Sequence, residues 1–435
     1  MKPFSEALRQ PWKNSRSFRV WTVLAVIGLV INLAVTILWQ LEIVSFEDAP
    51  PANDLQIYLE AGVRFLQLED LYIAPRADFG LYAYSPTFAM LFGLLTFLPY
   101  KLVWVLDALF HFVAYWLLYW RWFVIFREQG LDGAAKQLVR LLPLWIIFTG
   151  LLYEIAYMNI YIFMALFATL LLEALLQQQT GKAILWLAIL LPIKPQWAFA
   201  LGIPFLLGQW RFFARVVGGA ILAYLCIFLI TVLVGSSYVL EQYREYIQFL
   251  QTIPQTFGWN TIAEPGHIGY NNSLLQLVNF FTNKAADSVG LTTVIKILLS
   301  LPLIVLYWQY RRQTSNNAPS GFILEWTFAL YLLAFLWLDV VTELTLAIVL
   351  FSYLMGTLSN PALKRLTQLV FLPYALTHIW ITFSGIASFL APLPDLVIDP
   401  SLFIPFILIA MLGLYGLLLM QLNNKMRDQK VATAA

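Results

Sequence analysis

Apolar stretches long enough to cross a lipid bilayer recur along the whole chain and restrict its fold more than any other feature. A bilayer-spanning helix needs about 18 to 25 predominantly apolar residues. The composition fits repeated spans, because 61% of the residues are hydrophobic and 11% are charged, whereas about a quarter of a soluble domain is charged. Since lipid offers no hydrogen-bond partners, each stretch must satisfy its own backbone as a helix. The sequence therefore predicts an all-α polytopic membrane protein with one domain over residues 1–435.

We expect about twelve membrane-spanning helices. The first follows a basic N-terminal segment and lacks a small-residue cleavage site, so it should be retained rather than removed as a signal peptide. Two short segments meet at Lys194-Pro195-Gln196. Because proline interrupts a helix, this pair is expected to enter the membrane from one face and return to it. The predicted spans are 20–40, 101–126, 139–157, 160–177, 183–193, 197–208, 212–234, 288–308, 322–339, 342–358, 366–387 and 402–421.

The orientation follows from the basic residues, most of which fall in alternate connections and at both ends of the chain. Cytoplasmic segments carry the excess of lysine and arginine, so we predict a plasma-membrane protein with both termini in the cytoplasm. Two long segments, 41–100 and 235–287, then lie outside the cytoplasm. Within them, amphipathic or short apolar patterns predict helices that lie at the membrane surface over 54–68, 86–97 and 238–250.

Ionisable residues inside predicted spans point to the location of the site, because such residues are costly in lipid and are usually functional. In the predicted topology they all lie toward the outer ends of their helices, which favours a site that opens to the outer face. A transporter would more often place such residues near the midplane, between repeats. The residues are Asp107, Glu154, Lys194, Lys296, Asp339 and Glu343.

Several classes of site and partner are excluded by composition. The basic residues form short clusters at span ends rather than one patch, so no nucleic acid is expected as a partner. Cys226 is the only cysteine, which excludes an intramolecular disulfide and a cysteine-based metal site. The histidines show no metal-ligand spacing, so we predict no zinc site. The outer acidic residues could bind a divalent cation, but no cofactor is required by the sequence.

Two residues have both a structural and a functional interpretation. Asp54 opens the predicted helix 54–68; it could cap that helix, or its carboxylate could take a proton from an attacking hydroxyl. Lys194 lies between two short apolar segments; it could extend its ammonium to the membrane interface, or anchor a phosphate group. The adjacent Gln196 would then add hydrogen-bonding groups.

Taken in order, these residues resemble glycosyltransferase family 87, membrane mannosyltransferases of the GT-C superfamily that use polyprenyl-phosphate sugars. The resemblance covers about residues 20–300 and rests on the spacing of several motifs. It departs at Leu338-Asp339-Val340-Val341-Thr342-Glu343, where the family has a histidine-containing stretch. Two segments match only in part, since Ser85 stands where the family has a proline and Asn159 is the one residue kept from its motif. The matching segments are Asp54, Tyr58, Leu71-Tyr72, Tyr84-Ser85-Pro86, Asn159, Ile193-Lys194-Pro195-Gln196, Gln209-Trp210-Arg211 and Asn271-Asn272-Ser273-Leu274.

The resemblance implies a GT-C-like fold and an inverting glycosyltransferase that acts on the extracytoplasmic face. Asp54 would be the catalytic base, and Lys194 would steady the leaving phosphate of a polyprenyl-phosphate sugar, with mannose as the expected hexose. The partners would be this donor, a lipid-linked or glycan acceptor, and membrane lipids. The rival interpretation is a membrane transporter or a flippase for lipids or polyprenyl phosphate; a non-catalytic scaffold would leave Lys194 unexplained. The other expected substrate-binding residues are Tyr58, Tyr84, Asn159, Gln196, Asn272 and Ser273, with Asp339 and Glu343 as secondary candidates.

Overall fold

The computed structural model describes most of the chain, and every regular element in those residues is a helix, with no strand among them. Two of the helices, η1 (Leu94–Phe97) and η2 (Pro195–Leu201), are 3-10 helices and the others are α-helices. The all-α prediction is confirmed. The described residues are 2–43, 53–72, 82–256, 273–282, 288–313, 323–338, 345–390 and 404–434.

Among these residues, 6 helices are long and apolar enough to cross a membrane, or 7 if a bent pair counts as one span. The predicted number of about twelve is therefore not confirmed. Four predicted spans form helices of 10–17 residues, which are too short to cross alone: α9 (Tyr161–Leu176), α10 (Thr180–Ile193), α15 (Ile323–Trp337) and α16 (Ala347–Thr357). The long helices are α2 (Arg16–Gln40), α5 (Tyr100–Glu128), α12 (Trp210–Thr256), α14 (Ser288–Gln313), α17 (Pro361–Leu390) and α18 (Ile404–Ala434).

Two predicted spans differ in form from what the hydropathy pattern indicates. The segment expected as one helix over 139–157 belongs to α6 (Asp132–Arg140), α7 (Leu142–Ile146) and α8 (Thr149–Tyr157), with a bend of 58° after α6. The segment expected over 197–208 is η2 followed by the short α11 (Gly202–Leu206). An apolar segment can be buried in lipid without forming one straight helix. The length of apolar segments therefore overstates the number of spans that are single straight helices.

The break predicted at Lys194 is present. α10 ends at Ile193, and Lys194 has φ −143° and ψ 88°, outside the helical region. Pro195 then starts η2, which packs against α9, α10 and α15. The fixed φ of proline suits the first position of a new helix. Lys194 is thereby held between two helices rather than on the face of one.

Helices also form in the three segments that were predicted to lie at the membrane surface: α3 (Asp54–Gln67), α4 (Pro86–Gly93) with η1, and the last part of α12. α12 is interrupted at Ser236, whose φ of 53° separates the span from the segment that was expected over 238–250. α3 packs closely on α4 at Gly62, where a Cβ atom would lie 2.5 Å from the Gly93 nitrogen. Only glycine permits this approach of the two backbones.

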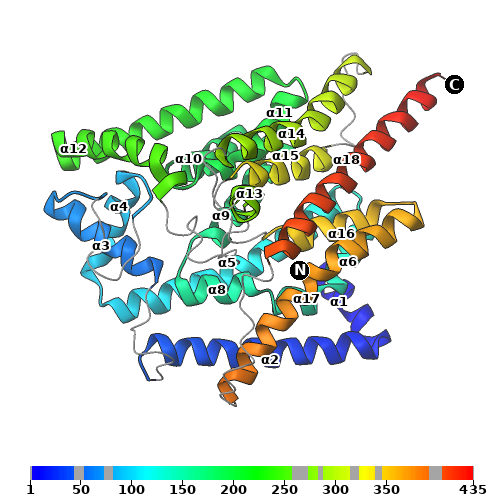
Figure 1. Cartoon of the computed structure of the whole chain (residues 1–435), viewed down its shortest axis with the longest axis horizontal. Coiled ribbons are helices and arrows are strands. Elements are labelled where there is room, and N and C mark those ends of the chain that lie inside the picture. Colours follow the sequence, from blue (N-terminus) through cyan, green and yellow to red (C-terminus); the bar gives the residue numbers. More distant parts are fainter. Residues whose placement is uncertain are drawn as a thin grey trace.

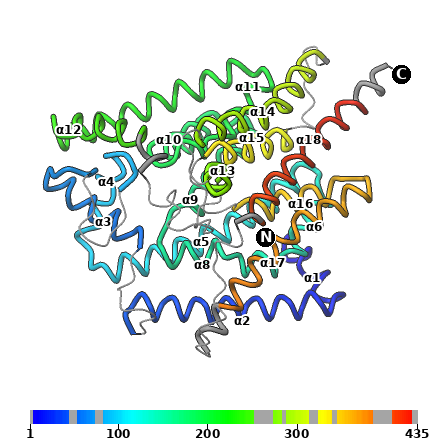
Figure 2. Tube along the Cα trace, in the orientation of Figure 1, coloured from blue at the N-terminus to red at the C-terminus, as the bar shows by residue number. Residues whose placement is uncertain are grey.

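The arrangement of these elements places the two ends of the molecule far apart. α2 and α12 run along opposite edges, with α5, α8, α9 and α10 between them (Figure 1). The Cα trace in Figure 2 shows α3 and α4 at one end of the long axis, and α1 (Lys2–Asn14) toward the other. The first end holds Asp54 and Tyr58, which belong to α3, and Tyr84, which directly precedes α4.

Candidate active site

The start of α3 is fixed by Asn53 and not by Asp54. The Asn53 side-chain oxygen accepts a hydrogen bond from the Gln56 backbone N–H at 3.0 Å, so Asn53 is the N-cap. Its Nδ2 donates to Gln40 Oε1 at 3.0 Å and to the Tyr100 hydroxyl at 2.8 Å, which ties α3 to the ends of α2 and α5. The capping interpretation of Asp54 is therefore wrong. Its carboxylate is the first side chain of the helix and is free for another role.

Asp54 lies at one end of a chain of hydrogen-bonded tyrosines. Its carboxylate is hydrogen-bonded to the side chain of Tyr58, one turn further along α3. The Tyr58 hydroxyl lies 3.1 Å from the Tyr84 hydroxyl, and the two rings meet edge to face at 5.2 Å. Tyr72 donates from its hydroxyl to the Tyr84 carbonyl at 2.7 Å. The two segments that precede and follow residues 73–81 are therefore joined at the site.

Lys194 lies on the other side of Tyr84. Its Nζ is 3.6 Å from the centroid of the Tyr161 ring and 5.5 Å from that of the Tyr84 ring, in cation–π contact. The Ser85 hydroxyl donates to the Pro192 carbonyl at 2.8 Å and so holds the start of α4 against the end of α10. No salt bridge involves the Lys194 ammonium within the described residues, although its charge acts on Asp54. A cation in this position is available for an anionic ligand.

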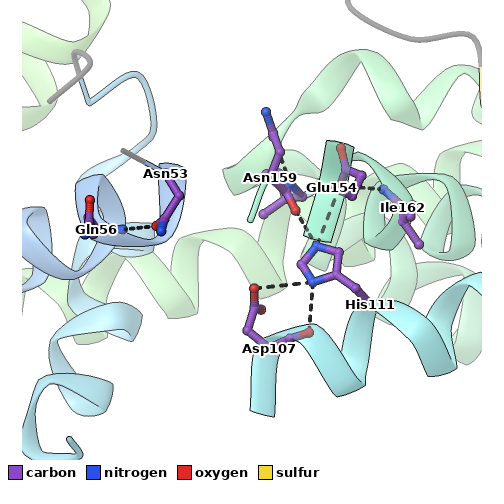
Figure 3. Close-up of polar contacts among 8 residues, drawn as sticks. Asn53, Gln56, Asp107, His111, Glu154, Asn159 and Ile162 are labelled. Atoms are coloured by element: carbon purple, nitrogen blue, oxygen red, sulfur yellow. Dashed lines mark hydrogen bonds and ion pairs between the residues drawn. The ribbon is translucent and has the colours of Figure 1, made fainter. Parts of the chain in front are cut away.

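A cluster of three ionisable side chains, Asp107, His111 and Glu154, includes the carboxylate whose charge acts on Asp54. Figure 3 shows the His111 ring between the other two side chains. His111 Nδ1 lies 2.9 Å from the Asp107 carbonyl oxygen and 3.3 Å from Asp107 Oδ2. On the opposite edge of the ring, Nε2 is hydrogen-bonded to the Asn159 carbonyl and lies 3.6 Å from Glu154 Oε2. Glu154 also accepts from the Ile162 backbone N–H at 3.3 Å, near the N-terminus of α9.

The charge of His111 follows from its partners. Each ring nitrogen faces a backbone carbonyl, and a carbonyl oxygen can only accept a hydrogen bond. Both nitrogens must therefore carry hydrogen, which makes the ring a cation. His111 is 0% and Glu154 1% exposed, so the ring compensates a Glu154 charge that would otherwise be buried alone. Because both ring nitrogens donate, the ring has no lone pair for a metal ion, and the described residues include no other group suited to hold one.

The burial and the charged neighbours of the Asp54 carboxyl change its pKa. Burial raises the pKa of Asp54 to about 6, and the negative charge of Glu154 acts in the same direction. The positive charge of Lys194 and the hydrogen bond from Tyr58 oppose that rise. Burial also raises the pKa of Tyr84 to about 12, so its hydroxyl stays neutral. Asp54 can thus accept a proton at neutral pH, while the neighbouring tyrosine hydroxyls keep theirs.

The other predicted site residues are placed less centrally. Asn159 enters the cluster through its backbone carbonyl, while its side-chain oxygen accepts from the Ile160 N–H at 2.8 Å. Gln196 is half-buried in the first turn of η2. Ser273 is buried, and its hydroxyl oxygen accepts from the Gln276 N–H at 3.2 Å at the start of α13 (Leu274–Thr282). The remaining candidates, Asn272, Asp339 and Glu343, lie outside the described residues.

Sequence reasoning overlooked three contributors. His111 was considered only as a metal ligand, although its position four residues after Asp107 in an apolar helix indicates a buried ion pair. Tyr161 and Asn53 carried no signal of their own, because their roles depend on contacts with Lys194 and Gln40.

Comparison with known proteins identifies the type of chain that carries this site. The model of Glycosyltransferase family 87 matches residues 82–336, which is more than half of the sequence. Tyr84, Asn159, Lys194 and Gln196 fall within the match, whereas Asp54 precedes it. No curated protein and no solved structure matches the chain.

Proposed function

The chain belongs to glycosyltransferase family 87 and is a membrane glycosyltransferase, and from this premise we propose that it transfers a hexose, mannose in the first instance, from a polyprenyl-phosphate donor to a lipid or glycan acceptor. The observation that carries the proposal is the meeting of Asp54 and Lys194 at one site. A carboxylate that can accept a proton near neutral pH lies there beside a cation that lacks a salt bridge in the described structure.

In the proposed reaction Asp54 takes the proton from the acceptor hydroxyl. The acceptor oxygen attacks the anomeric carbon from the face opposite the leaving group, and the bond from that carbon to the phosphate oxygen breaks. The electron pair of this bond moves to the phosphate, so the configuration at the anomeric carbon is inverted. Lys194 stabilises the negative charge that develops on the phosphate in the transition state.

An apolar cavity next to Lys194 supports a donor with a hydrocarbon chain. The cavity has a volume of about 490 Å³ and lies between α4, α10 and α12. Its lining includes Phe88, Ile189 and Ile227, and it extends to Pro192 and Ile193, directly before Lys194. A prenyl chain that occupied this cavity would bring its phosphate to the Lys194 ammonium.

The Lys194 assignment is tested by two substitutions. Lys194→Arg keeps the positive charge and Lys194→Ala removes it, so we expect the alanine variant to use the donor at least about tenfold less well than the arginine variant. Initial rates of polyprenyl-phosphate release, measured over a range of donor concentrations, give the comparison. Equal and small losses of donor use in both variants would contradict this assignment and mean that the Lys194 ammonium only extends to the membrane interface.

We further propose that both termini are cytoplasmic and that the site faces the extracytoplasmic side. The basic helix α1, with Lys13 in its last turn, lies opposite α3 and α4 along the molecule, which supports this orientation (Figure 2).

The orientation is tested with two exposed glutamines, Gln67 at the end of α3 and Gln129 after α5. In a Cys226→Ser background, a cysteine at Gln67 should react with an impermeant thiol reagent added to intact cells, and a cysteine at Gln129 should react only after lysis. The reverse pattern would contradict the proposed topology.

A further inference from the structure

A second cavity lies at the end of the molecule opposite Asp54. Its volume is about 710 Å³, and it is an open cavity lined by α1, α2, α6, α7 and α17. α1 packs on both α2 and α6, and the 58° bend after α6 forms part of the wall. The proposed sugar transfer uses nothing in this region.

The polar part of this cavity is suited to an anion. Lys136 and Arg140 lie one turn apart on α6, line the cavity and are exposed. Neither makes a salt bridge or a side-chain hydrogen bond in the described part of the chain. Ser15, the N-cap of α2, and Ser17 in its first turn add the positive end of a helix dipole. No aspartate or glutamate is among the lining residues.

The rest of the lining is apolar. Phe18, Ala25, Leu144, Ile147 and Phe383 continue the cavity away from the basic pair and along α2. α2 is itself a candidate membrane span with most of its surface unburied in the protein, so this apolar part lies beside the lipid. A site with a cationic mouth and an apolar interior at a span end matches the two parts of a phospholipid.

We propose that this cavity binds one anionic phospholipid, with its phosphate at Lys136, Arg140 and the α2 N-terminus and its acyl chains along the apolar lining. Basic pockets between membrane helices recognise anionic lipid headgroups in this way. A zwitterionic lipid fits less well, because its ammonium group would meet two cations and no lining carboxylate. A free anion would leave the apolar interior without an occupant. The assignment is independent of the glycosyltransferase mechanism.

Native mass spectrometry of the delipidated full-length protein tests the proposal. Dioleoyl phosphatidylglycerol should bind with a stoichiometry of one, and dioleoyl phosphatidylcholine, which has the same chains, much more weakly. Lys136→Gln combined with Arg140→Gln should weaken phosphatidylglycerol binding about 30-fold, because each of the two basic residues is expected to strengthen binding of an anionic headgroup about fivefold. Inorganic phosphate and glycerol 3-phosphate, which lack acyl chains, should not displace the lipid.

The matched control is Lys182→Gln combined with Arg215→Gln, an exposed lysine and arginine that do not line the cavity. This control should bind phosphatidylglycerol as the unmodified protein does, and the lipid-free thermal midpoint of both double variants should be unchanged. Equal binding of the two lipids, an equal loss in the control, or displacement by inorganic phosphate would each overturn the proposal.

Discussion

An Asp54→Asn enzyme is expected to fold and bind its donor but to transfer sugar about 10²–10⁴-fold more slowly, the range typical of general-base catalysis. The substitution keeps the size of the side chain and removes its ability to take a proton. Helix capping does not complicate the result, because Asn53 caps α3 through its bond to the Gln56 N–H. Donor binding and the transfer rate should be measured on the same preparation.

Asp132→Asn is a matched control for this variant. Asp132 is likewise the first residue of a helix, α6, but it is exposed and pairs with Arg127 at 2.6 Å, away from the proposed site. It should transfer sugar at the unmodified rate. An Asp54→Asn enzyme that also does so would end the assignment of Asp54 as the base.

The pH dependence of the unmodified enzyme is a second test of Asp54 as the base. Since the pKa of Asp54 is raised to about 6, its carboxyl is ionised above that pH and becomes protonated below it. A protonated carboxyl cannot accept the acceptor's proton, so kcat/KM should fall as the pH decreases through about 6. The negative charge of Glu154 raises the pKa of Asp54. A Glu154→Gln enzyme should therefore lose activity only at a lower pH than the unmodified enzyme does.

His111→Gln is expected to lower stability by about 3–5 kcal/mol, the cost of leaving a buried charge without its partner. Glu154 is 1% exposed and loses its cationic neighbour at 3.6 Å in this variant. Adding Glu154→Gln should recover much of the loss, because the orphaned carboxylate is then gone. The sum of the two single effects should therefore exceed the effect of the double variant. Thermal unfolding midpoints in one detergent measure all three.

His378 supplies the control for this cycle. It is also buried, but its Nδ1 lies 2.6 Å from the Thr149 hydroxyl and it makes no ion pair with a carboxylate of the described residues. His378→Gln should combine additively with Glu154→Gln. Additive losses for His111→Gln and Glu154→Gln as well would show that the His111 ring is uncharged.

Much of the fold was predictable because local rules determine it. The helical break at Lys194 follows from Pro195, and the start of α3 follows from Asn53-Asp54, although either residue could have been the cap. The number of simple spans was not predictable, since hydropathy does not reveal the 58° bend after α6 or the 3-10 conformation of η2.

The site was predictable only in part, for a related reason. Asp54, Tyr58, Tyr84 and Lys194 could be named from motif spacing, and the structure brings them together. The His111–Glu154 contact joins α5 to α8, and such a contact depends on how separate helices pack. Tertiary contacts of this kind leave no periodic pattern in either helix.

The central claim is that Asp54 and Lys194 catalyse sugar transfer from a polyprenyl phosphate, and one reconstitution tests it. Purified protein in liposomes is given polyprenyl-phosphate mannose that carries labelled mannose, together with a lipid extract of the host membrane as acceptor. We expect the label to move into a product with inverted anomeric configuration, with release of one polyprenyl phosphate for each sugar and no transfer by Asp54→Asn. Intact donor carried across the bilayer without cleavage would contradict the account and identify a flippase instead.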